Sequence, residues 1–241
     1  MKTVYQNKVF RMFPLPSFVK RFIKLAIQFK GLRFPPPPPP FQYRGRWFRL
    51  FEHECNCGWR DGLMTERAVE LSIADWWLKR HAREGVVEVG AVTPYYWRNR
   101  VKTVIDPSDR HSAVTHRTSL FNFDFAGRTV LSISTVEHVG AGEYGLEALR
   151  TEDCTAALRL FVEQSKSCLI TFPTGYAPAL DAFVMSPEFK ALQEALSLNV
   201  TVYKRNASSN HFELYMGNDI SSIPFGVNGI RIANGVVIIE K

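Results

Sequence analysis

Polar side chains that could do chemistry follow four short apolar runs, VVEVG, VKTVID, TVLSIS and CLITFP, at the points where the runs end. Such runs are typical of buried parallel strands, whose carboxyl ends meet at one edge of a sheet, where ligands bind. We therefore take the residues that leave the first three runs as the candidate site. They are Glu88, Gly90, Ala91, Asp106, Ser134, Thr135, Glu137 and His138.

The acid after the second run suggests what this site would bind. Asp106 lies sixteen positions beyond Gly90 and suits a bidentate acceptor for ribose hydroxyls, as in an adenosine-containing cofactor. Gly90 has no Cβ and would let the backbone pass close to such a ligand. A second interpretation makes Asp106 a turn or helix-cap residue before Pro107, and both interpretations stay open.

A histidine supplies the candidate base. The unperturbed pKa of histidine lies near neutrality, so His138 could take a proton from a hydroxyl acceptor, with Glu137 orienting it or binding cofactor. The alternative is that His138 caps the following turn or helix. Glu66, Arg67 and Glu70 either reach the same site from a preceding helix or form an exposed, salt-bridged helix face.

Helical and strand patterns alternate along the chain and define the elements that would position these residues. Helical spacing covers 65–79, 145–164 and 186–196, and the end of the chain changes to the strand-like segments NVTVYKR, NHFELYM and GVVIIEK. We predict an α/β fold with a doubly wound, mostly parallel sheet and an antiparallel C-terminal edge.

Segments spread over residues 55–240 resemble a branch of the class I S-adenosylmethionine-dependent methyltransferases, and SISTVEHVG is the most specific piece. The segments are TERAVE (65–70), VVEVGAVTPYY (86–96), TVIDPSD (103–109), VLSISTVEHVG (130–140) and ITFPTGY (170–176), followed by Asp181. The resemblance implies a Rossmann-like methyltransferase fold with S-adenosylmethionine as cofactor. The cofactor-binding residues that it implies are Glu88, Gly90, Ala91, Asp106, Ser134 and Thr135.

The same resemblance implies methyl transfer to a sugar or lipid-linked glycan precursor, for which we take His138 and Glu137 as the catalytic pair on the chemical grounds given above. The usual Gly-x-Gly-x-Gly turn is reduced to Gly90, with Ala91 and Thr93 after it. An alternative is therefore a catalytically inactive fold of this kind that serves as a membrane-tethered interaction module.

Charge is distributed unevenly along the chain. Residues 1–50 hold eleven Lys or Arg and no Asp or Glu, which leaves 19 basic against 23 acidic residues in the rest, a net charge of −4. Within this basic arm, residues 18–32 (FVKRFIKLAIQFKGL) show helical spacing of Phe, Leu and Ile with Lys and Arg between them. We predict an amphipathic helix on an anionic membrane surface, to which each cation contributes about 1 kcal/mol.

The arm leaves other interpretations open. Its helix could pack on its own domain or on a partner, a transit peptide is not excluded, and a nucleic-acid role lacks a recognisable module. Six prolines at 35–40 form a polyproline spacer of about 20 Å or, alternatively, an SH3 ligand. We therefore divide the chain into a basic arm (1–34), a spacer (35–40) and an α/β domain (41–241).

Composition and weaker motifs set further limits. With 46% hydrophobic and 22% charged residues, the chain has the composition of an ordinary globular protein. Its four cysteines favour a reducing compartment, and together with the basic arm they predict a cytoplasmic, peripheral location at a membrane surface.

The segment 140–145 matches G-x-G-x-x-G but lies too far from the preceding strand for an NAD site. His53, Cys55 and Cys57 lack a fourth zinc ligand, so we expect no metal, and the oligomeric state is left open.

Overall fold

The central element of the protein is a seven-stranded sheet. We analysed a computed structural model that describes residues 39–53, 65–142, 153–206, 211–217, 219–227 and 230–241. The basic arm and most of the proline run lie outside these residues. The strands, in their order across the sheet, are β4 (Thr103–Ile105), β3 (Val87–Val89), β5 (Thr129–Ile133), β6 (Ser167–Pro173), β11 (Gly235–Glu240), β7 (Asn199–Arg205) and β8 (Phe212–Leu214).

The four strands that the apolar runs predicted are parallel, which confirms that prediction. Val87 of β3 pairs with Thr103 of β4 on one side and with Val130 of β5 on the other, and β5 pairs with β6 in the same direction. The C-terminal part is antiparallel: β11 runs against both β6 and β7, and β8 runs against β7. The last strand is therefore inside the sheet, between two strands that precede it in sequence, and β8 forms the edge.

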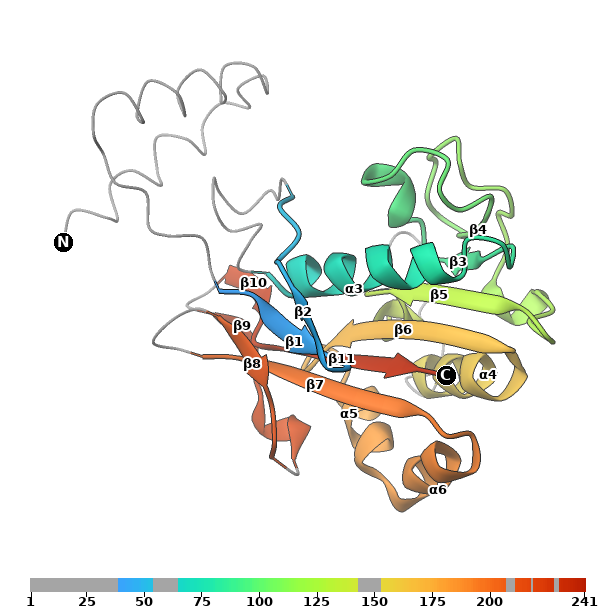
Figure 1. The fold of residues 1–241 in the computed structure, drawn as a ribbon. Helices are drawn as coiled ribbons and strands as arrows, with labels where there is room; N and C mark the ends of the chain where they lie inside the picture. The colour runs from blue at the N-terminus through green and yellow to red at the C-terminus, as the bar shows by residue number, and fades with distance from the viewer. Residues whose placement is uncertain (1–38, 54–64, 143–152, 207–210, 218, 228–229) are drawn as a thin grey trace, which may run out of the picture.

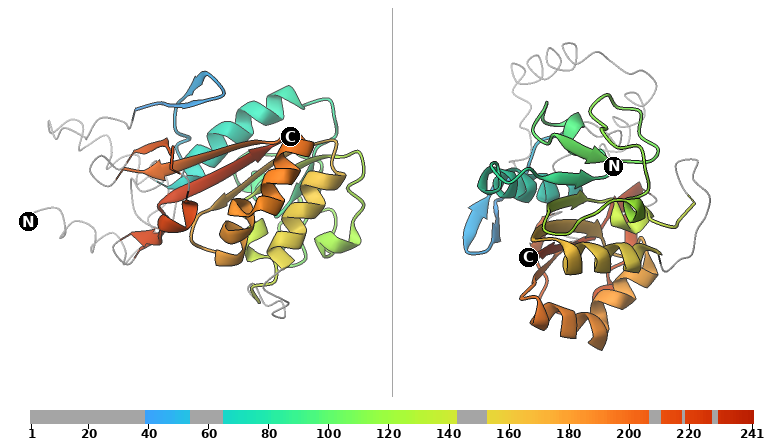
Figure 2. Two further views of the ribbon diagram at one scale, coloured as in Figure 1. Left: turned by 90° about the horizontal axis from the view of Figure 1, so that it is seen from below. Right: turned by 90° about the vertical axis from the view of Figure 1, so that its right-hand side faces the viewer.

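Helices cover both faces of this sheet (Figures 1 and 2). Helix α3 (Glu66–Arg80) lies along one face, and α4 (Asp153–Gln164), α5 (Pro178–Met185) and α6 (Pro187–Ala195) lie on the other. Helix α3 begins one residue after the predicted start at 65, and α6 matches the prediction for 186–196. Helix α4 corresponds to the second half of the predicted 145–164 helix, whose first half falls outside the described residues.

The chain is an α/β protein, but the repeated strand–helix units that we predicted are incomplete. Residues 90–128, all of them described, contain no α-helix. Besides β4, they hold only the short 3-10 segments η2 (Thr93–Tyr95) and η3 (Leu120–Asn122). Pro94 follows β3 closely and Pro107 follows β4, and proline disfavours an α-helical conformation at the residue before it. The connections around β4 are therefore loops.

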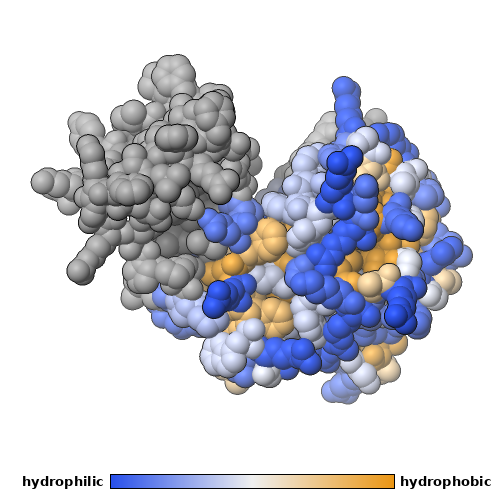
Figure 3. Space-filling view, turned by 45° about the horizontal axis from the view of Figure 1, so that its top comes forward, coloured by the Kyte–Doolittle hydropathy of each residue, from blue (hydrophilic) through white to orange (hydrophobic). Residues whose placement is uncertain are grey.

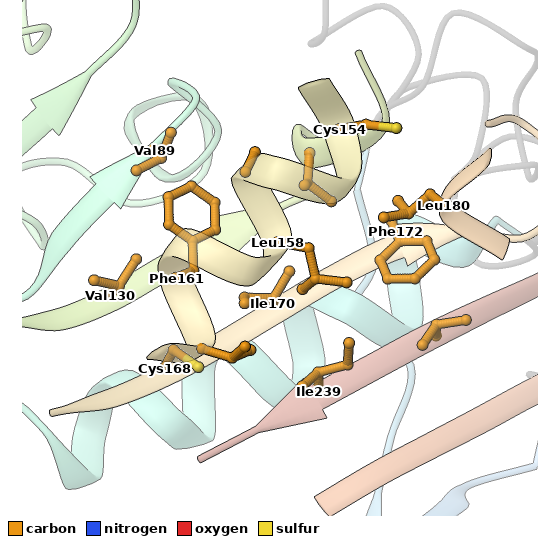
Figure 4. Packing of buried hydrophobic residues seen from close by; sticks show 14 of the residues in the cluster. Val89, Val130, Cys154, Leu158, Phe161, Cys168, Ile170, Phe172, Leu180 and Ile239 are labelled. Atoms are coloured by element: carbon orange, nitrogen blue, oxygen red, sulfur yellow. The ribbon is translucent and has the colours of Figure 1, made fainter. Parts of the chain in front are cut away.

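The core lies in two layers because side chains of a strand alternate between the faces of the sheet. Val130, Ile170 and Ile239 point to the layer under α4, where Leu158 and Phe161 pack on them (Figure 4). Neighbouring strand residues point the other way, and there Leu131 and Ile238 form a second cluster with residues of α3. Both faces of the central strands are thus buried, which explains why the sequence of those segments is continuously apolar.

Two hairpins were not predicted. Strands β1 (Phe41–Tyr43) and β2 (Arg46–Phe48) are joined at Arg44 and Gly45, which both have positive φ, the conformation of a tight two-residue hairpin turn. Strands β9 (Phe225–Val227) and β10 (Ile230–Ala233) form the second hairpin. Each strand is only three or four residues long, too short to give a clear alternating pattern.

The first hairpin packs beside α3 and β7. The hydroxyl of Tyr43 donates to Glu240 Oε2 at 2.7 Å, and the ring of Phe41 contacts that of Tyr203. On this side of the molecule, hydrophilic and hydrophobic side chains are intermingled at the surface (Figure 3).

Among the described residues, no helix has the length and apolar character needed to cross a membrane.

Candidate functional site

The loop after β3 is anchored by Glu88. This side chain is completely buried, and its Oε1 accepts hydrogen bonds from the backbone N–H groups of Val92 (3.0 Å) and Thr93 (2.6 Å), while Oε2 accepts from the Thr93 hydroxyl. Burial raises the pKa of Glu88 to about 7, and the hydrogen bonds oppose that rise. The carboxylate expected to touch a cofactor thus faces the loop backbone and fixes the path of residues 90–93.

Asp106 connects the loops that leave β3 and β4. Its Oδ1 accepts from Ser108 N (2.9 Å), Ser108 Oγ (3.1 Å) and Asp109 N (2.8 Å). Its Oδ2 accepts one hydrogen bond, from Ala91 N at 3.1 Å. The turn interpretation of Asp106 is therefore confirmed. It does not exclude the ligand interpretation, because a carboxylate oxygen can accept two hydrogen bonds and Oδ2 shows one.

Gly90 is needed for a different reason from the one expected. Its φ is +83°, and a Cβ there would lie 2.0 Å from Thr135 Oγ1 and 2.6 Å from Thr135 Cγ2. The close approach at Gly90 is thus made by Thr135, whose hydroxyl donates to the Ile133 carbonyl at 3.0 Å. The missing side chain of Gly90 lets the loops after β3 and β5 come into contact, and the approach of a ligand to this backbone stays a prediction.

The end of β5 is held by a carboxylate from α3. Ser134 has φ +40°, and its hydroxyl donates to Glu70 Oε1 at 2.6 Å, while its N–H donates to the Thr171 carbonyl. The Thr171 hydroxyl, on β6, donates to the same oxygen at 2.8 Å. Glu70 therefore joins α3 to the ends of two neighbouring strands, and Ser134 faces this carboxylate.

Charged side chains gather beside that contact in what we call the acidic cluster, Glu66, Arg67, Glu70 and Glu137. Arg67 Nε lies 3.6 Å from Glu70 Oε2, and Glu66 Oε2 accepts from Ala233 N at 3.2 Å. Burial raises the pKa of Glu137 well above its ordinary value, and burial followed by the charge of Glu70 raises that of Glu66. The interpretation of Glu66, Arg67 and Glu70 as an exposed salt-bridged face is wrong.

Three atoms of the acidic cluster are buried without a hydrogen-bond partner among the described residues. They are Arg67 Nη1, Glu70 Oε2 and Glu137 Oε2. The Arg67 side chain as a whole keeps 23% of its surface exposed, but this terminal nitrogen is out of solvent. Unpartnered buried polar atoms are rare in folded proteins because each costs about 1–3 kcal/mol.

His138 lies at the rim of the acidic cluster. It ends the 3-10 segment η4 (Val136–His138), and its Nε2 lies 3.7 Å from Glu137 Oε1. The imidazole is 21% exposed and meets the ring of Tyr176 edge to face, with centroids 4.7 Å apart. The structure thus brings the predicted pair Glu137 and His138 together, with one carboxyl group inside and one imidazole at the surface.

Sequence reasoning missed three contributors to this site. Thr171 lies within β6, Tyr176 follows it, and Tyr96 follows η2, where burial raises the pKa of its phenol while Arg67 lowers it and Glu70 raises it. Only Tyr176 carried a usable signal, because it comes just after the carboxyl end of the fourth apolar run. The other two are brought in by packing between elements far apart in the sequence.

The rejected zinc motif is only partly described. His53 Nε2 lies 2.9 Å from Thr65 Oγ1, and Cys55 and Cys57 lie outside the described residues. In the described part of the chain, no group of three or more His, Cys, Asp or Glu side chains could hold a metal ion.

Together these contacts give a site with two halves at one edge of the sheet. The first half, the loop 90–93 and Asp106, lies at the ends of β3 and β4, and the second, the acidic cluster with His138, lies at the ends of β5 and β6. Asp106 Oδ2 keeps accepting capacity that would fit the ribose of an adenosyl group, and at Gly90 the space that a Cβ would take is filled by Thr135.

The chain was compared with known proteins. No model of a protein family matches it, and no curated protein does. Among solved structures, it is similar to a chain in "Structure of the Pnkp1/Rnl/Hen1 RNA repair complex", with 11% sequence identity and a TM-score of 0.37. The match covers 93% of this chain and 47% of that one, so this chain spans about half the length of that protein. A likeness this weak carries no argument about function.

Proposed function

We propose that the protein is an S-adenosylmethionine-dependent methyltransferase with a doubly wound, Rossmann-like fold. The observation that carries the proposal is the position of the site at the change of strand order. From β3 the chain goes outward to β4 and then returns to β5 on the other side, and open α/β sheets bind ligands at such a point. Asp106, the loop 90–93 and the pair Glu137 and His138 all belong to this edge.

The first half of the site would hold the cofactor. Asp106 Oδ2 would accept from ribose hydroxyls, on a loop whose path is fixed by Glu88. Tyr95, which is 61% exposed and donates to Asp109, offers an aromatic face nearby. When bound, S-adenosylmethionine supplies a methyl group already activated by a positively charged sulfur.

The second half would receive the acceptor. Such a reaction depends mainly on alignment, which can contribute on the order of 7–11 kcal/mol. A hydroxyl acceptor also needs a base, and His138 presents a partly exposed imidazole next to the buried Glu137. Glu137 would orient this imidazole, and Tyr176 would keep its ring in place from the other side.

We place the reaction at a membrane surface and propose a sugar or lipid-linked glycan precursor as the acceptor. The support is the charge of the basic arm, with eight Lys or Arg and no Asp or Glu in residues 1–34. The β1–β2 hairpin, the first described element after the prolines, adds exposed arginines at 44, 46 and 49 and Trp47, which is 70% exposed. Arginine and tryptophan together are common where proteins meet lipid headgroups.

One observation favours the alternative, a catalytically inactive fold that serves as a membrane-tethered module. Thr135 fills the space in front of Gly90, and three of the four hydrogen bonds to Asp106 belong to its own turn. Such packing could have replaced a lost ligand.

Calorimetric titration of the purified chain with S-adenosylmethionine separates the two. An active site binds the cofactor, and Asp106→Ala abolishes binding, whereas Asp124→Ala, which removes a comparable turn carboxylate on an exposed loop, leaves binding unchanged. No heat of binding at millimolar cofactor would remove the methyltransferase proposal and leave the inactive module.

A further inference from the structure

The acidic cluster has more carboxyl groups than cations. Glu66, Glu70 and Glu137 contribute three carboxyl groups, and Arg67 contributes one guanidinium. The other described titratable groups that interact with the cluster are the Tyr96 phenol and the Glu88 carboxyl group, both through Arg67, the Cys154 thiol through Glu137, and the His138 imidazole, 3.7 Å from Glu137. Burial raises the pKa of Glu137 and of Glu66, the charge of Glu70 adds to both rises, and Arg67 opposes them.

The unpartnered atoms of the cluster complement one kind of chemical group. Glu70 Oε2 and Glu137 Oε2 are buried acceptors without donors, and Arg67 Nη1 is a buried donor without an acceptor. A primary ammonium brings three N–H donors and one positive charge in a small volume. A neutral hydroxyl would bring a single donor and leave the charge uncompensated, and an anion would be repelled.

The arginine adds a second requirement. Its Nη1 would donate to an oxygen on a carbon near the amine, which is the pattern of a vicinal amino alcohol such as an amino sugar.

The acidic cluster lies on the β5–β6 side of the sheet, because Glu70 accepts hydrogen bonds from Ser134 and Thr171. The arrowheads of β5 and β6 point toward the end of the molecule where α3 begins (Figure 1). The loop 90–93 and Asp106 lie on the β3–β4 side.

We propose that the acidic cluster binds the primary ammonium group of the methyl acceptor, with Glu70 and Glu137 as acceptors and Arg67 as donor to a neighbouring oxygen. The assignment to the acceptor rests on the proposed methyltransferase function. Binding an ammonium favours the ionised form of Glu137 and so opposes the rise that burial causes in its pKa; we therefore expect binding to release a proton from this carboxyl group to solvent.

The test uses the full chain saturated with S-adenosylhomocysteine and titrated calorimetrically with glucosamine and with glucose, which differ by one amine. We expect glucosamine to bind at least tenfold more tightly. Titration in Tris and in phosphate buffer should give different heats, because a released proton is taken up by the buffer. This readout needs no variant.

A variant pair locates the site. Glu137→Gln should weaken glucosamine binding at least tenfold and remove the buffer dependence, and Glu194→Gln, an exposed glutamate on α6, should change neither. Equal binding of glucose and glucosamine, or no binding of either, overturns the proposal. Displacement of S-adenosylhomocysteine by glucosamine also overturns it, because the cluster would then hold the cofactor's own ammonium. If glucosamine binds but S-adenosylhomocysteine does not, the methyltransferase proposal fails and the ammonium site stands.

Discussion

Gly90 and Thr135 form a tight contact in the site, and adding one methyl group at position 90 tests how tight it is. We expect Gly90→Ala to lower the free energy of unfolding by about 2–4 kcal/mol, measured by urea denaturation. Two costs add: the strain of an alanine at positive φ and the overlap with the Thr135 side chain.

The control for that substitution is Gly127→Ala. Gly127 has φ +68° and open space around its Cβ position, so the change carries the backbone strain alone, about 1–2 kcal/mol. Replacing Thr135 with glycine in the Gly90→Ala background should recover part of the difference. If the two glycine variants lose equal stability, the contact is not tight.

Glu88 makes stability depend on pH. Its pKa is raised by burial from 4.5 to about 7, so between these values the carboxyl ionises in the unfolded chain before it does in the folded one. Stability is therefore full below about pH 4.5 and falls as pH rises to about 7, by up to roughly 3 kcal/mol. Asp181, with a pKa of about 6, adds a change of the same sign. In Glu88→Gln the free energy of unfolding should fall less between pH 5 and 8, and an unchanged slope would contradict the assignment.

At the scale of elements, the apolar runs were predictable from the sequence, and the close packing between elements was not. The runs that became β3 to β6 are buried on both faces, so their composition alone identified them. The glutamate at position 70 looked like a surface residue because it lies among Glu66 and Arg67 on a helix, and only its contacts with β5 and β6 show that the helix turns this side inward. The end of β3 was placed correctly, but the partner of Gly90 comes from 45 residues further along the chain.

The connection between α3, β5 and β6 through Glu70 should be strong. Glu70→Ala leaves Arg67 without its ion pair and two hydroxyls without their acceptor, so we expect a loss of about 3–5 kcal/mol in urea denaturation. Lys79→Ala, on the same helix with a 68% exposed side chain, should cost under about 0.5 kcal/mol. Combining Glu70→Ala with Arg67→Met should cost less than the sum of the single changes, and strict additivity would argue against the pair.

For the whole molecule, the uneven charge predicts where the protein goes. We expect it to float with vesicles that contain anionic lipid and much less with neutral ones. Changing Lys20, Arg21, Lys24 and Lys30 to serine should reduce recovery with anionic vesicles at least tenfold, because each cation contributes about 1 kcal/mol near such a surface. Changing Lys166 and Lys190 of the α/β domain to serine is the control, and we expect it to leave recovery with anionic vesicles nearly unchanged. Equal recovery with both vesicle types would remove the electrostatic part of the proposal.

The position of β11 has a consequence for biosynthesis. Residues 235–240 fill the gap between β6 and β7, which precede them by some 30 to 70 residues. While a ribosome is still producing the nascent chain, both of those strands have an open side that can pair with another polypeptide. Until β11 emerges, these two strands are therefore open to wrong pairing, and we expect a chaperone to be most useful in that interval.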